Sequence, residues 1–503
     1  MRTITLILSI PLSLLCSAQL GFSIVHVGDG NASGEGRSIF ETSYGYLLFS
    51  AEVDQNTSRT WLYTSRFDLE GEYLDGHTFS GTGNLDVGLV DCVVQEVEGS
   101  FTSATLRFAS SEAPELRLYR FSAFGDTLIT YPIGTEPSQA SRDCLAVGDG
   151  TYLLAGWCTI GEDPVDDCAC LRRVAADGQE LWRRTWPERL MYHTVNAVED
   201  GNFLVGGSRF STTDKTVLMK VNSDGEEIWT RYLGGYSPYS GGAAHATHMS
   251  NGDYLVPGSW LPQDSINNSE RGFASLYCYA PNGDLRWRRD LLYGRLAGAS
   301  LSRMAAQGEY WVVGGYYQVP RDPDVATTLW RVDNNGETLY SRKYWYYGGE
   351  GAANAATYGM DTTSDGGLVL TGTAYEGING LEPFNHKTWI LKLDQHGCLV
   401  PGCHTVGLQD YELALQGALQ VSPNPTQDVL RFSLDLPSGY PLQGNVQALV
   451  LDAQGKEVAR QNIAANGLQV AGTIALNGQA PGLYYLHLRD EVKWLAGQKV
   501  VVE

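Results

Sequence analysis

Aromatic side chains in the long segments between predicted strands are the residues best suited to bind a ligand. Exposed rings of this kind stack on sugar rings or anchor a protein interface. Such rings also cover the ends of hydrophobic cores, and for any single residue of the set we favour that role. For the set as a whole we predict a binding face. Its members are Trp157, Trp260, Tyr316, Tyr317, Trp345, Tyr346 and Tyr347.

The sequence offers little for metal or nucleophilic chemistry. His245 and His248 are three residues apart in a predicted strand, so they point to opposite faces and make a poor metal pair. No HExxH, GxSxG or paired CxxC motif occurs, and we assign no catalytic residue. Oxygen ligands that could gather Ca²⁺ occur at Glu162, Asp163, Asp166 and Asp167. We favour a solvated loop there and predict no metal and no cofactor.

Eight of the nine cysteines lie beyond the first 18 residues, and an even number in an exported chain permits disulfides. Cys398 and Cys403 are close enough in sequence to pair. Cys158 has two possible partners, Cys168 and Cys170, and the sequence leaves the choice open.

Two kinds of glycine turn recur along residues 19–403 and define the elements that would position the aromatic loops. The first turn precedes an apolar run, and its glycines are Gly45, Gly99, Gly150, Gly201, Gly252, Gly308 and Gly366. The second turn has Gly71, Gly125, Gly178, Gly225, Gly283, Gly336 and Gly397. First-turn glycines are 54, 51, 51, 51, 56 and 58 residues apart, which gives seven repeats. A short hairpin needs a positive φ that glycine supplies, so each repeat is predicted to hold two hairpins.

Four short strands in each of seven repeats predict an all-β fold with a seven-bladed β-propeller. Residues 22–28 form a strand before the first full repeat, and we expect them to supply the outer strand of the last blade. Trp182, Trp229, Trp287 and Tyr340 each stand four residues after a second-turn glycine, so they share a face and pack between neighbouring sheets. Both hairpin turns lie at one end of a blade, so the long connections emerge together on the opposite face, where binding usually resides.

Composition and charge narrow the classes of partner. The 503 residues are 43% hydrophobic and 18% charged, which is enough to bury large cores in two or more domains. Lys and Arg total 35 against 57 Asp and Glu, and the resulting charge of −22 repels nucleic acid and anionic lipid.

Residues 1–18 predict a cleaved signal peptide. They combine Arg2, an apolar run from Ile4 to Leu15 and small residues before Gln19. The apolar run is shorter than the roughly 20 residues of a membrane-spanning helix, so we predict export through the periplasm and no transmembrane segment.

The pattern changes after Cys403. Residues 404–420 are predicted to be a linker, and residues 421–503 alternate apolar and polar residues between turn signals, which predicts a small Ig-like β-sandwich. Four motifs in this segment contain Pro423, Asn424, Pro425, Gly455, Lys456, Gly482, Tyr484 and Lys499. In order and spacing these motifs resemble the type IX secretion sorting domain (type A) of Bacteroidetes. The resemblance implies recognition by the secretion machinery and a sortase, and a protein that is secreted or attached to the outer cell surface.

Two classes of function remain open for the propeller. The first, which we favour, is a binding protein that recognises a glycan, a polymer or a protein on the long-loop face. The second is an extracellular polysaccharide-active enzyme or, less favoured, a quinone-dependent oxidoreductase. Trp182 and Trp229 lie in DGxxxW units, and Trp287 lies in the corresponding NGxxxW unit. The DGxxxW units resemble the tryptophan-docking repeats of quinoprotein dehydrogenases. Those enzymes commonly have one blade more and adjacent cysteines, whereas this chain has Cys168-Ala-Cys170. A propeller fold does not choose between these functions.

Overall fold

The structure is a computed structural model that describes most of residues 21–503. Outside the described residues are 1–20, 27–31, 55–58, 82–91, 108–114, 135–138, 160–166, 187–189, 199, 210–215, 234–245, 261–270, 296–298, 307–308, 316–325, 347–354, 376–385, 400, 406–409, 413–414, 416, 438–439, 441 and 466. The predicted signal peptide, residues 1–18, therefore lies outside them.

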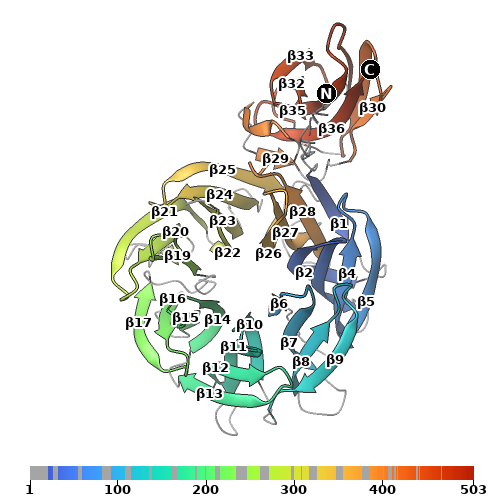
Figure 1. Cartoon of the computed structure of the whole chain (residues 1–503). Coiled ribbons are helices and arrows are strands. Elements are labelled where there is room, and N and C mark those ends of the chain that lie inside the picture. The colour runs from blue at the N-terminus through green and yellow to red at the C-terminus, as the bar shows by residue number, and fades with distance from the viewer. Residues whose placement is uncertain are drawn as a thin grey trace, which may run out of the picture.

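Six four-stranded sheets and four strands of a larger sheet form a ring in the described part of the chain (Figure 1). The first two sheets contain β2 (Ala32–Thr42), β3 (Gly45–Asp54), β4 (Arg59–Phe67), β5 (Tyr73–Gly81); and β6 (Val93–Gln95), β7 (Phe101–Arg107), β8 (Glu115–Phe121), β9 (Thr127–Pro132). The next two contain β10 (Gln139–Ala146), β11 (Thr151–Thr159), β12 (Asp167–Ala175), β13 (Glu180–Trp186); and β14 (Leu190–Ala197), β15 (Phe203–Arg209), β16 (Thr216–Val221), β17 (Glu227–Leu233). The remaining three contain β18 (Thr247–His248), β19 (Tyr254–Trp260), β20 (Arg271–Tyr279), β21 (Leu285–Arg295); β22 (Ala299–Ala306), β23 (Glu309–Gly315), β24 (Thr327–Asp333), β25 (Thr338–Trp345); and β26 (Ala355–Thr362), β27 (Leu368–Tyr375), β28 (His386–Leu393), β1 (Phe22–His26). The predicted all-β fold and the propeller are confirmed.

The glycine turns have the predicted geometry. Thirteen of the fourteen turn glycines are described, and all thirteen have positive φ; Gly308 lies outside the described residues. In the turn at Gly71, the Gly71 N–H donates to the Asp68 carbonyl at 3.1 Å, and the Asp68 N–H donates to the Glu72 carbonyl at 3.0 Å. This is a type I turn closed by a glycine in the left-handed region, which is one of the common short hairpin connections.

Tryptophans on the outer strands join neighbouring sheets, as predicted. Trp229 donates from Nε1 to the Pro281 carbonyl at 3.0 Å, and a Cβ added to Gly283 would lie 2.8 Å from its ring. Gly225 and Gly336 are in the same close contact with Trp182 and Trp287 of the preceding sheets. Only glycine leaves room for the ring, so the same residue sets the turn and accepts the neighbouring sheet.

The ring closes through the N-terminal strand. β1 pairs antiparallel with β28, with Ile24 opposite Ile390, and becomes the outer strand of the sheet formed by the last repeat. The prediction for residues 22–28 is confirmed over Phe22–His26; the residues that follow lie outside the described part. Joining the first and last strands of the propeller segment in one sheet removes an open edge from the ring.

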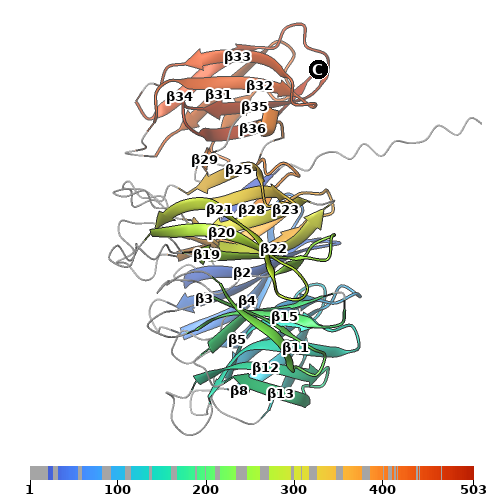
Figure 2. The same cartoon turned by 90° about the vertical axis from the view of Figure 1, so that its left-hand side faces the viewer.

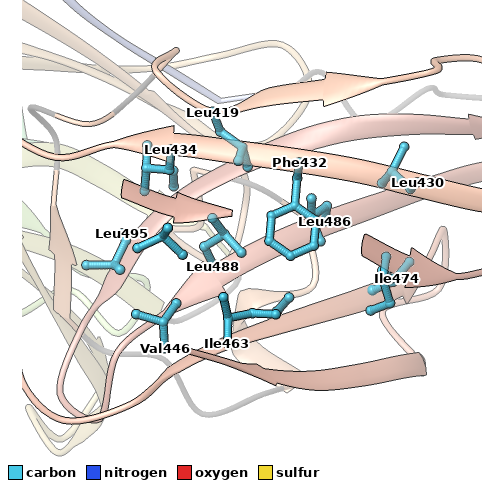
Figure 3. Close-up of a cluster of buried hydrophobic side chains, with 14 of the residues drawn as sticks. Leu419, Leu430, Phe432, Leu434, Val446, Ile463, Ile474, Leu486, Leu488 and Leu495 are labelled. Atoms are coloured by element: carbon cyan, nitrogen blue, oxygen red, sulfur yellow. The ribbon is translucent and has the colours of Figure 1, made fainter. Parts of the chain in front are cut away.

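Two facing sheets form the C-terminal domain. One contains β30 (Gln420–Ser422), β31 (Val429–Asp435) and β34 (Gln469–Ala475); the other contains β36 (Trp494–Val502), β35 (Gly482–Arg489), β32 (Val446–Asp452) and β33 (Glu457–Ile463). Figure 3 shows the apolar side chains between them, among them Phe432 from one sheet and Leu486 from the other. Leu486 is completely buried, so this domain has a core of its own.

The segment expected to be a linker is partly ordered and joins the two domains. A 3₁₀ turn covers Cys403–Thr405, and β29 (Asp410–Glu412) pairs in parallel with β25 of the propeller and with β36 of the C-terminal domain. Leu415 and Leu419 are buried in the C-terminal core. One propeller sheet (β22 to β25), β29 and one sheet of the C-terminal domain thus form a single nine-stranded sheet within the described residues. The C-terminal domain stands on the rim of the ring (Figure 2).

Candidate functional site

The structure places the predicted loop aromatics in different surroundings. Trp157, on β11, is half-buried against the core between the second and third sheets. Trp345 ends β25, where it pairs with Glu412 of β29, and Tyr346 packs against the core shared with the C-terminal domain. Trp260 ends β19, and its side chain is outside the described part. Tyr316, Tyr317 and Tyr347 also lie outside the described residues.

Trp157 is therefore separated from Trp345 and Tyr346 by several sheets of the ring. The structure does not bring these three together as one platform. Trp345 and Tyr346 lie beside the linker strand β29.

Several charged groups with shifted pKa values serve the hairpins. Lys392 is fully buried on β28 and donates to both carboxylate oxygens of Asp365, in a first-turn hairpin, at 3.0 and 2.8 Å. Burial opposes ionisation of Asp365, but the hydrogen bonds from Lys392, Thr363 and the Gly367 N–H, together with the charge of Lys392, outweigh burial and lower the pKa of Asp365. Lys220 on β16 and Asp200, in the turn between β14 and β15, form a similar pair in the fourth sheet. These carboxylates stabilise the turns in which they lie.

Asp394 is the carboxylate whose environment most resembles that of a catalytic acid. Burial raises its pKa. Its Oδ1 accepts hydrogen bonds from the backbone N–H groups of His396 and Cys398, both at 2.8 Å. The group caps the second turn of the last repeat, so its position is explained by the fold. Within the described residues, no group of three or more His, Cys, Asp or Glu side chains could hold a metal ion; Glu162, Asp163 and Asp166 lie outside them, as does the side chain of Asp167.

The cysteines divide into bonded pairs and a buried thiol cluster. Cys398 and Cys403 form a disulfide with their Cα atoms 5.7 Å apart. Cys158 and Cys168 lie opposite each other on β11 and β12 with their sulfurs 3.3 Å apart. The hydrogen bond with Cys168 and the burial of the site raise the pKa of Cys158 to about 11, so this thiol is protonated. Cys170 lies in the same buried cluster.

Sequence reasoning missed the disulfide between Cys92 and Cys144, which joins the segment before β6 to β10. The two residues are 52 positions apart, close to the repeat length. That interval places them at equivalent points of neighbouring sheets and could have predicted the pair.

The predicted sorting motifs lie where the two ends of the C-terminal domain meet. Asn424 donates from Nδ2 to the Lys499 carbonyl at 2.8 Å and accepts at Oδ1 from the Val501 N–H at 2.9 Å. Its amide thus pairs with β36 as a neighbouring strand would. Pro423, Asn424, Pro425 and Lys499 are exposed, so this contact forms a surface that a partner can reach.

The other sorting motifs shape the same sheet. Gly455 has φ of 77° in the turn between β32 and β33, where the exposed Lys456 donates its N–H to Asp452 Oδ1 at 2.9 Å. Tyr484 follows Gly482 at the start of β35, is buried, and donates its hydroxyl to the Ala480 carbonyl at 2.8 Å.

Comparison with known proteins identifies the C-terminal domain. Residues 420–503 match the family described as the secretion system C-terminal sorting domain. No curated protein matches the chain. Among the described residues, no helix has the length and apolar character needed to cross a membrane.

Solved structures resemble the chain only distantly. A polysaccharide lyase, an ulvan lyase, is 8% identical with a TM-score of 0.47, covering 74% of this chain and 93% of its own. The β-propeller domain of the trilobed protease from Pyrococcus furiosus is 8% identical with a TM-score of 0.37, covering 74% and 94%. A protein of unknown function from Dyadobacter fermentans is 11% identical with a TM-score of 0.39, covering 75% and 99%. At these scores the likeness carries no inference about activity.

Proposed function

We propose that this protein, whose residues 420–503 are a type IX secretion sorting domain, is an exported propeller that binds a glycan, a polymer or a protein at the cell surface or outside the cell. The sorting domain is the observation that carries the proposal. We further propose that the seven groups of strands are seven blades, that the C-terminal domain is an Ig-like sandwich, and that a sortase acts on the exported chain.

The described titratable groups favour binding over catalysis. Asp365, Asp200 and Asp394, whose pKa values are shifted, hold hairpin turns in place. An enzyme that acts on polysaccharide needs carboxylates placed beside a substrate. Trp157, at the long-loop end of β11, is available to a ligand in part, since its side chain is half-buried.

The binding proposal is tested with the full chain on an array of glycans and polysaccharides, together with an assay for released reducing ends and unsaturated sugars. Retention without turnover is expected. A Trp157→Ala variant should lose retention, whereas Tyr44→Ala, an exposed ring on the opposite, hairpin-turn face, should keep it. Turnover would overturn the binding proposal in favour of an enzyme.

The export proposal has a separate test. A chain that ends at Leu419 lacks the matched domain and should accumulate in the periplasm, whereas the full chain should reach the medium or the cell surface. Fractionation and immunoblotting distinguish the two. Equal export of both chains would contradict the role assigned to residues 420–503.

A further inference from the structure

The innermost strands of several propeller sheets carry a β-bulge at the same place. Pairing with the second strand skips a residue between Gly36 and Ser38 in β2, Ser141 and Asp143 in β10, Tyr192 and Thr194 in β14, and Thr357 and Gly359 in β26. The skipped residues, called here the bulge residues, are Arg37, Arg142, His193 and Tyr358. A bulge leaves one residue unpaired and re-aims its side chain, and bulges are frequent beside functional sites.

The repeat specifies these positions. Arg37 precedes the first-turn glycine Gly45 by eight residues (45 − 37 = 8). The same interval separates Arg142 from Gly150, His193 from Gly201 and Tyr358 from Gly366. The backbone feature is therefore common to the repeats, while the side chain that it presents varies and is polar or charged in all four.

The bulge residues lie on the strands nearest the centre of the ring. β2, β10, β14 and β26 each stand at the end of the strand order of their sheet, and they surround the axis in Figure 1. The side chains are partly exposed, and Tyr358 has the largest exposure at 38%. They are thus placed to meet a ligand that approaches along the axis.

Two bulge residues already contact each other across the closure of the ring. The Arg37 guanidinium lies 4.4 Å from the centre of the Tyr358 ring and pairs with Glu35. A Cβ added to Gly359 would lie 2.4 Å from the Arg37 carbonyl oxygen, so the glycine permits this close approach. Arg37 and Tyr358 come from the first and last sheets, which shows that bulge side chains reach across sheet boundaries.

Buried groups fix the bulge of β10. Asp143, next to Arg142, is 1% exposed, and its carboxylate accepts hydrogen bonds from the Val195 N–H of β14 at 2.8 Å and from the Cys144 N–H at 2.9 Å. Cys144 is bonded in turn to Cys92. Arg142 therefore projects from backbone that is tied to the sheets on both sides, which pre-organises it for binding.

We propose that the bulge residues form an anion-binding site on the propeller axis that takes a carboxylate or sulfate group of an acidic glycan. Arg37 and Arg142 place two guanidinium groups on innermost strands of a chain of net charge −22, and a guanidinium is a planar fork that pairs with an oxyanion. A ligand would compete with Glu35 for Arg37. His193 and the Tyr358 hydroxyl add donors for the same group. The choice of a glycan rests on the proposed function; the preference for an anion does not.

The test is affinity electrophoresis of the full chain at physiological salt through gels that contain dextran sulfate, polygalacturonate or neutral dextran. Both polyanions, or the one whose charged group fits, should retard the protein, and neutral dextran should not. Arg142→Gln and Arg37→Gln should each weaken retardation about tenfold. Arg288→Gln, which removes the same charge from the outer strand β21, should bind as the unchanged protein does. If Arg142→Gln fails to fold, His193→Gln tests the same ring.

The outcomes separate this inference from the proposed function. Equal binding by Arg142→Gln and Arg288→Gln would overturn the axial site. Binding of a neutral glycan or a protein but of neither polyanion would overturn the axial site and keep the proposed function. Failure to bind any probe of the array or the gels would overturn both.

Discussion

The second-turn glycine Gly225 has two roles: it adopts a positive φ, and it leaves room for a tryptophan of the preceding sheet. The first-turn glycine Gly201 of the same repeat has only the first role, so the two roles can be measured separately. Gly201 and Gly225 both follow an aspartate and have φ of 76° and 75°. A Cβ at Gly201 would meet nothing within 4 Å, whereas a Cβ at Gly225 would lie 2.6 Å from the Trp182 ring. Gly201→Ala should lower the free energy of unfolding by about 1 to 2 kcal/mol through backbone strain alone. Gly225→Ala should cost about 1 to 3 kcal/mol more because the ring must move.

Denaturant unfolding of the two variants measures this difference. Gly201→Ala is the matched control, since it has the same backbone strain without the contact. Equal losses would show that the tryptophan does not depend on the glycine beneath it.

A buried histidine gives the C-terminal domain a defined dependence on pH. His487 on β35 is 0% exposed and accepts at Nδ1 from Trp494 Nε1 at 3.2 Å. Burial lowers the pKa of His487 to about 4 from its ordinary value of 6.5. Between these values the unfolded chain binds a proton that the folded chain does not, so the free energy of unfolding falls as pH decreases from 6.5 to 4. The loss reaches roughly 3 kcal/mol at pH 4 and levels off below that pH.

Unfolding measured across this pH range should show a shallower slope for His487→Gln, which has no titrating ring. An unchanged slope would mean that His487 titrates alike in the folded and unfolded chain. His404, whose pKa is also lowered by burial, adds to the slope in both proteins and leaves the difference between them unaffected.

At the scale of the element, the exposed Asn424 holds the first residues of the sorting domain to its last strand. Asn424→Ala removes both amide bonds to β36 and should lower the free energy of unfolding of the domain by about 1 to 2 kcal/mol. Asn445→Ala, an exposed asparagine of the same domain, is the control and should change little. Thermal unfolding of the full chain and, separately, hydrogen exchange in β36 measure the effect of each variant. An equal loss of stability in the two variants would contradict the role assigned to the hydrogen bonds between Asn424 and β36.

The elements that the sequence predicts well are those whose signal is local. Positive φ at glycine and the tryptophan four residues later are set within one turn, so the hairpins and the packing between sheets follow from the repeat. The closing strand could be predicted because residues 22–28 form a strand before the first full repeat, while the last repeat has only three strands of its own.

The features that were missed depend on contacts between distant segments. β29 becomes a strand because β25 and β36 lie on either side of it, and nothing within Asp410–Glu412 indicates a parallel bridge. The disulfide between Cys92 and Cys144 and the positions of the bulge residues could have been predicted, because their spacing follows the repeat. The surroundings of Trp345 were out of reach, because they depend on how the sorting domain docks.

At the scale of the whole molecule, the propeller and the sorting domain share a core. Trp389 and Tyr344 of the propeller lie in one buried cluster with Tyr485 and Trp494 of the sorting domain. Glu412 of β29 is fully buried, and its Oε2 accepts from Lys493 Nζ at 3.0 Å and from the Tyr440 hydroxyl at 3.2 Å. A buried ion pair of this kind leaves an uncompensated charge when either partner is removed, so the linker strand is fixed to the sorting domain.

Because of this shared core, we expect a substitution in the sorting domain to destabilise the propeller only when the substituted residue lies in the interface between the two domains. Trp494→Ala should cost about 3 to 5 kcal/mol and should raise amide exchange in both β36 and the propeller strand β28. Phe432→Ala, a comparably buried ring in the sandwich core away from the propeller, should raise exchange in the sorting domain and leave β28 protected. Hydrogen exchange with mass spectrometry distinguishes the two patterns. If Trp494→Ala leaves β28 as protected as Phe432→Ala does, the two domains are energetically independent despite their contact. If β28 loses protection, the domains are coupled, and removal of the sorting domain would expose apolar surface on the rim of the propeller beside β25.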